Sequence, residues 1–141
     1  MNVPEPITLL WLALRSRVET IPFSPAMPIA WPADSFEPGG AAYLSVSFQP
    51  GDPGRLTIGD RGPHPLTGSM AVALVVPVAL QWDPARILNN AGVIAKAFPP
   101  GLVMRCGTAR ATVTKPATIQ PVYRDGAYFR APVIVRWQAS I

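Results

Sequence analysis

The sequence predicts an α+β fold, in which two α-helices pack on one face of a mostly antiparallel β-sheet. Two stretches, about residues 5–20 and 83–97, have the apolar spacing of helices. Most other apolar segments have the composition or alternation of strands, and Asp125-Gly126 is typical of a hairpin turn. A chain of 141 residues suits one domain, which we expect to span residues 1–141.

The first helix is expected to begin at Pro4-Glu5-Pro6, because proline is tolerated in a first turn and an acid complements the helix dipole. Pro22 ends it. Apolar residues also occupy much of the opposite side, which is typical of a helix buried on two sides. The main apolar face consists of Ile7, Leu10, Trp11, Leu14, Val18 and Ile21.

The second helix has clear signals at both ends. Asp83 suits the N-cap and Pro84 the first helical position, whereas Pro99-Pro100-Gly101 stops the helix. The apolar stripe expected to face the sheet consists of Ile87, Leu88, Ala91, Ile94, Ala95 and Phe98.

Strands are predicted before and after the second helix. Residues 29–31 form a short edge strand because prolines flank them, and residues 43–48 alternate as a half-buried strand does. Residues 68–78 are apolar on both faces, which favours a central strand with Pro77 near its end. The later strands are expected at 102–115, with Gly107 as a bulge or bend, at 118–123 and at 127–139.

Composition indicates a surface that is unusually apolar for a monomer. Charged residues make up 14% of the chain and hydrophobic residues 49%, whereas a small soluble protein usually keeps a charged surface. We therefore expect part of the surface to be buried against other subunits. The alternative is a monomer stiffened by its 18 prolines. No signal peptide or membrane span is expected, since the apolar run 70–80 is about half the length of a span.

The charge pattern gives little support for a dedicated nucleic-acid patch. The net charge is +4, and ten of the twelve cations are arginine. They are scattered from Arg15 to Arg136 without a run of five. A basic surface that tolerates a nearby polyanion is the better interpretation.

The residues offer no chemistry that indicates an enzyme. His64 and Cys106 are the only residues of their types, so one chain cannot form a multi-His or multi-Cys metal site. No phosphate-binding glycine loop or serine elbow is present, and no cofactor is expected. Asp34 and Glu37 lie close in sequence, but a proline-rich loop explains them equally well.

Several short motifs occur in the order found in phage tail terminator-like proteins. The stretch 42–52 resembles the strand and loop "YL-x-V-x-x-x-P-G" of that family, and 126–133 resembles its last strand. Further similarities are Ile29–Pro32 after the first helix, Gly59, Gly68–Pro77, Phe98-Pro99-x-Gly101 and Pro116. The turn at Trp82-Asp83-Pro84 and the proline-rich segment 22–38 depart from the pattern.

The resemblance implies an α+β subunit of a hexameric ring. Such a ring caps the tail tube, stops its polymerisation and contacts the head completion or stopper protein, while DNA passes through the lumen without sequence-specific binding. The resemblance covers phages and gene transfer agents alike. It implies a virion protein made in the host bacterial cytoplasm, without membrane partners.

The long loop 49–67 is expected to contact a neighbouring subunit or ring, because long loops in small domains are usually functional. The candidate contact residues are Arg55, Arg61 and His64. Two alternatives remain at this stage. One is another neck or head-tail connector protein, and the other is a small basic nucleic-acid-binding module, which the pI of 9.8 would suit.

Overall fold

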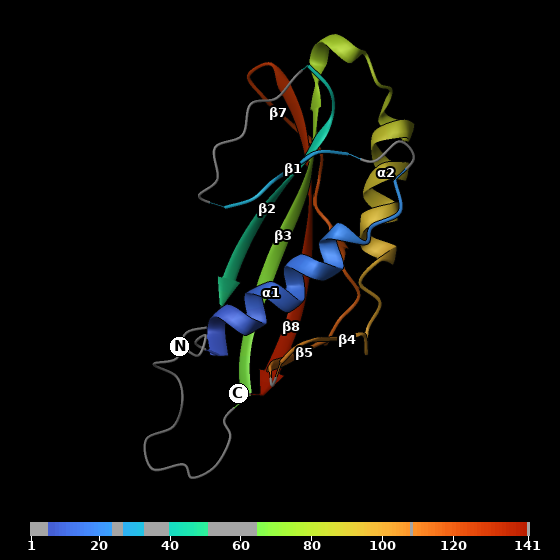
Figure 1. Ribbon diagram of the computed structural model, residues 1–141. Coiled ribbons are helices and arrows are strands. Elements are labelled where there is room, and N and C mark those ends of the chain that lie inside the picture. The colour runs from blue at the N-terminus through green and yellow to red at the C-terminus, as the bar shows by residue number, and fades with distance from the viewer. Residues whose placement is uncertain (1–5, 24–26, 33–39, 51–64, 108, 141) are drawn as a thin grey trace.

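The computed structural model describes residues 6–23, 27–32, 40–50, 65–107 and 109–140. Within these ranges it contains two α-helices, one 3-10 turn and eight strands (Figure 1). In chain order the elements are α1 (Pro6–Glu19), β1 (Ile29–Ala30), β2 (Tyr43–Pro50), β3 (Pro65–Pro77), η2 (Val78–Leu80), α2 (Pro84–Lys96), β4 (Val103–Cys106), β5 (Ala109–Val113), β6 (Thr118–Ile119), β7 (Tyr123–Asp125) and β8 (Tyr128–Ser140).

The strand β8 organises the sheet. One of its edges pairs with β3 along all 13 residues, and its other edge pairs in turn with β5, β6 and β7. The main strand order is β1-β2-β3-β8-β5-β4, and among the described strands only the β1–β2 pair is parallel. The mostly antiparallel sheet predicted from the sequence is therefore confirmed.

Both predicted helices are confirmed to within one residue at each end. Asp83 is the N-cap of α2, since its Oδ1 accepts a hydrogen bond from the Arg86 amide at 2.8 Å. β3 ends at Pro77 as expected. The Asp125-Gly126 signal also holds, because Gly126 adopts φ +61° at the turn between β7 and β8.

Two predicted strands are each divided in the structure. The segment 102–115 reverses at Gly107, whose φ of +58° suits glycine, and so gives the antiparallel pair β4 and β5. The segment 118–123 becomes β6 and the start of β7, because Pro121 has no amide hydrogen to continue the ladder.

Both helices pack on the same face of the sheet, as predicted, and the sheet curls around them as a half-barrel (Figure 1). α1 lies over β4 and β5, whereas α2 lies over β3, β8 and β6. The fully buried residues of this inner face include Leu10, Leu14, Leu74, Ile94, Phe98 and Trp137.

An aromatic cluster joins α1 to the sheet. Trp11 lies 5.4 Å from Phe48 and 5.8 Å from Trp31, measured between ring centroids. Phe48 stacks on Trp137 at 5.6 Å, with the rings 11° from parallel. The ring of Trp137 lies directly against Gly68, where an added Cβ would meet its Cζ2 at 2.5 Å. Glycine at position 68 therefore makes room for the stack.

Candidate functional site

The three contact residues predicted from the sequence, Arg55, Arg61 and His64, lie outside the described residues. The segment that carries them leaves β2 at Pro50 and returns at Pro65. Candidate sites in the described part of the chain are a pocket between the helices and the uncovered face of the sheet.

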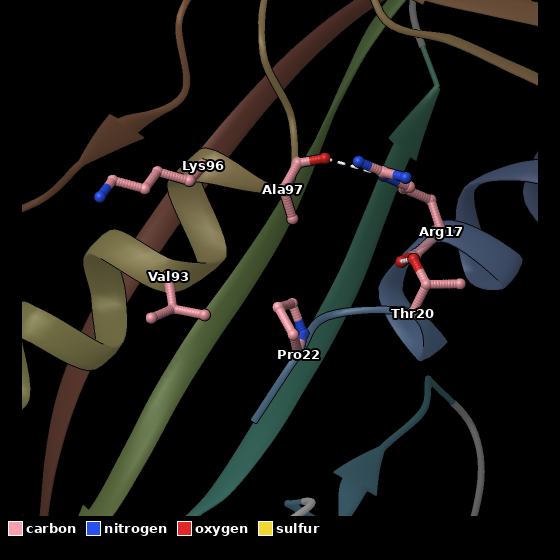
Figure 2. A pocket seen from close by; sticks show the side chains of 6 residues that line it. All are labelled: Arg17, Thr20, Pro22, Val93, Lys96 and Ala97. Carbon is pink, nitrogen blue, oxygen red and sulfur yellow. Dashed lines mark hydrogen bonds between the residues drawn. The ribbon is translucent and has the colours of Figure 1, made fainter. Parts of the chain in front are cut away.

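A pocket of about 470 Å³ lies between the end of α1 and the end of α2 (Figure 2). Arg17 extends from α1, and its Nε donates a hydrogen bond of 2.8 Å to the backbone oxygen of Ala97. Ala97 is the C-cap of α2, so the guanidinium binds a carbonyl at the negative end of that helix. Val93 and Pro22 give the pocket an apolar lining, Thr20 and Lys96 add a hydroxyl and an ammonium group, and none of the described lining residues is acidic. The hydrogen bond from Arg17 to Ala97 joins the end of α1 to the end of α2.

The opposite, outer face of the sheet is not covered by either helix. Its centre is flat because the side chains there are small, namely Ser45, Ser47, Ala71 and Ala73. At one end, the rings of Tyr43 and Tyr128 meet edge to face at 6.3 Å, beside the fully buried Val75. At the other end the outer face is basic.

The basic patch consists of Arg105, Arg110, Lys115 and Arg136, all of which are exposed. Arg105 and Arg110 are direct cross-strand partners on β4 and β5. Arg136 on β8 donates from Nη1 to the hydroxyl of Thr118 at 3.3 Å, and it forms no ion pair with any described residue.

Two adjoining hollows run across the basic patch. One of about 490 Å³ contains Lys115 and Arg136, and one of about 380 Å³ contains Arg110. Both include Thr114. The remaining polar lining consists of Gln49, Thr67, Ser69, Thr112 and Gln138. Among the described residues, no acidic side chain lines either hollow.

The sequence does not predict the basic patch because its members form no continuous run: Arg105, Arg110 and Lys115 are each five residues apart, and Arg136 lies on a later strand. Positions 105 and 110 become neighbours only when the chain reverses at Gly107, and 136 joins them only through the pairing of β5 with β8. The sequence signal that could place Arg110 and Arg136 on an outer face is the alternation of apolar and polar residues along 109–113 and 135–139.

Large apolar side chains are also exposed outside the core. Leu88 of α2 is 49% exposed, although its spacing predicts that it faces the sheet. The other large apolar side chains exposed among the described residues, by 38% to 50%, are Leu12, Leu80, Val103, Ile119 and Tyr123.

The described residues contain neither a cluster of metal-binding side chains nor a helix that could span a membrane. Among them, no three His, Cys, Asp or Glu side chains lie close enough together to hold a metal ion. Neither of the described helices is long and apolar enough to cross a membrane.

Known proteins share both the fold and the sequence pattern of this chain. One solved structure superposes with a TM-score of 0.76 at 23% sequence identity, covering 95% of this chain and 95% of that chain, and so shares the fold. No curated protein sequence matches the chain. A family model described as phage tail terminator protein matches residues 9–137. Because that match covers most of the chain, the protein belongs to the phage tail terminator family.

Proposed function

We propose that the chain is a structural virion protein that closes into a hexameric ring with copies of itself and caps the tail tube. The ring stops polymerisation of the tube protein and joins the tail to the head completion or stopper protein, with DNA passing through its lumen. Family membership over residues 9–137 is the observation that carries this proposal. The carrier is a tailed phage or a gene transfer agent, and the protein is made in the host bacterial cytoplasm.

The exposed apolar side chains support the ring. A closed ring needs two different surfaces on each subunit, which meet head to tail. Leu88 on α2 and Ile119 on β6 are 49% and 38% exposed, on elements that pack against each other. An apolar surface of this kind, next to buried core, is suited to one half of such an interface. We also propose that Arg55, Arg61 and His64 contact the adjacent subunit or ring.

The ring is tested by placing a charge in the apolar surface. Leu88→Glu should prevent ring formation without unfolding the subunit, because the side chain is already half exposed. Asn89→Glu is the matched control, since Asn89 is the next residue of α2 and is exposed. Mass photometry measures the assembly, with the protein alone and with purified tube protein, because some rings form only on their tube.

Tube length, measured by electron microscopy, tests the capping step. The wild type and Asn89→Glu should limit tube growth, and Leu88→Glu should not. A wild-type protein that stays monomeric at high concentration with tube protein present would contradict the ring. A ring that binds a neck protein but leaves tube growth unchanged would favour the other head-tail connector role.

A further inference from the structure

The acids among the described residues all have partners or roles away from the basic patch. These acids are Glu19, Asp83 and Asp125. Two of these acids have local roles, because Glu19 pairs with Arg15 and Asp125 pairs with Arg130. Asp83 caps α2. None of the three neutralises the basic patch.

The arrangement of the patch opposes stability. Arg105 and Arg110 are directly opposite each other on neighbouring strands, and like charges at such positions destabilise a sheet. Neither forms an ion pair with a described residue. An anion bound between them would remove the repulsion.

We infer that the basic patch binds the phosphodiester backbone of double-stranded DNA without reading its sequence. The inference rests on the proposed function, in which the ring encloses DNA. It assigns the contact with that DNA to one face of the subunit. From strand geometry, the patch extends roughly 14 Å along the strands and roughly 10 Å across them. A duplex presents one charge per ~1.7 Å of its axis, so several phosphates fall within this reach.

The chemistry of the surface favours DNA over a protein partner. Protein interfaces are anchored by buried aromatic and large apolar groups together with arginine, whereas lysine and acidic residues are depleted there. The two hollows instead present arginine, lysine, hydroxyl and amide groups, which are the usual donors to phosphate. In the described structure both helices lie on the inner face, so the outer face presents no helix to enter a groove and read bases.

The test compares two triple variants that have the same net charge. The patch variant is Arg105→Gln, Arg110→Gln and Arg136→Gln. The control variant is Arg86→Gln, Lys96→Gln and Arg124→Gln, which removes three cations from α2 and β7, outside the patch. Binding to a labelled duplex of arbitrary sequence is measured by fluorescence anisotropy over a series of salt concentrations. Near-ultraviolet circular dichroism confirms that both variants are folded.

The wild type should bind with a steep dependence on salt. The patch variant should bind about tenfold more weakly or worse, and the slope of log affinity against log salt should fall by about 2 to 3, because each lost phosphate contact removes ~0.9. The control variant should stay close to the wild type. Lysine at the three patch positions should restore most of the binding.

Other outcomes overturn the inference. Equal losses of DNA affinity in both triple variants would show that only net charge matters. If the wild type did not bind DNA even at low salt, the inference would be wrong. A patch variant that binds DNA like the control but fails to join tube protein would make the patch a protein-docking surface. Tube capping is measured in parallel. Capping without any DNA binding therefore refutes this inference and leaves the proposed function standing.

Discussion

The two faces of the sheet carry out different tasks with residues from the same strands. The inner face of β8 holds Val133, Val135 and Trp137, which are buried under the helices. Positions 134, 136 and 138 of the same strand point outward and are half-buried or exposed. The inner face thus determines whether the chain folds, whereas the outer face is available for what the folded subunit contacts.

The two faces should also differ in how well they tolerate substitutions. On the inner face, side chains fill a closed space in which shape and volume decide stability. On the outer face, small side chains and unpaired cations cost little to replace. Substitutions at adjacent positions should therefore differ sharply in their effect on the free energy of unfolding.

The largest contrast is expected between Trp137 and Gln138. Trp137→Ala should lower the free energy of unfolding by about 3 kcal/mol or more, because it removes a side chain that is 1% exposed and stacks on Phe48. The indole Nε1 has no hydrogen-bond partner within the described structure, so the loss is of packing alone. Gln138→Ala should change stability by less than about 0.5 kcal/mol. Urea denaturation measures both values, and similar losses would contradict the division into two faces.

A smaller contrast is expected between two glycines. Gly68→Ala should destabilise by about 1–3 kcal/mol, because its Cβ would meet Trp137 at 2.5 Å and the backbone oxygen of Gln49 at 2.7 Å. Gly92→Ala should instead stabilise by about 0.5–1 kcal/mol, since this glycine lies within α2 with nothing near its Cβ position. Thermal melting of the two variants gives the signs. Stabilisation by Gly68→Ala would show that the Trp137 stack can shift at little cost.

The elements of the fold could be predicted because their signals are local. Helical spacing, the Asp83-Pro84 start and the Pro77 stop each depend on a few adjacent residues, and each is confirmed. Leu88 shows the limit of such signals. The spacing of Leu88 is correct for the apolar stripe of a helix, but whether this side chain faces the sheet depends on how far the sheet extends beneath α2. In the structure Leu88 is 49% exposed.

The candidate sites could not be predicted because they depend on pairing between distant segments. Arg17 binds the carbonyl oxygen of Ala97, which is 80 positions away. The arginines of the basic patch meet through strand registers that no local pattern specifies. Scattered cations in a sequence therefore do not exclude a concentrated patch on a sheet.

The smallest expected effect concerns the outer face itself. Arg105→Gln should raise the free energy of unfolding by about 0.2–1 kcal/mol, because it removes a like charge directly opposite Arg110. The gain should shrink at high salt, where charges on an exposed surface are screened. Arg86→Gln is the control, and it should be neutral or slightly destabilising because the Arg86 guanidinium lies over the Trp82 ring at 3.9 Å. Denaturation at low and high salt measures the difference. A loss of stability in Arg105→Gln would mean that Arg105 has a favourable partner within the free subunit. A bound anion would then have no charge repulsion to relieve in the patch.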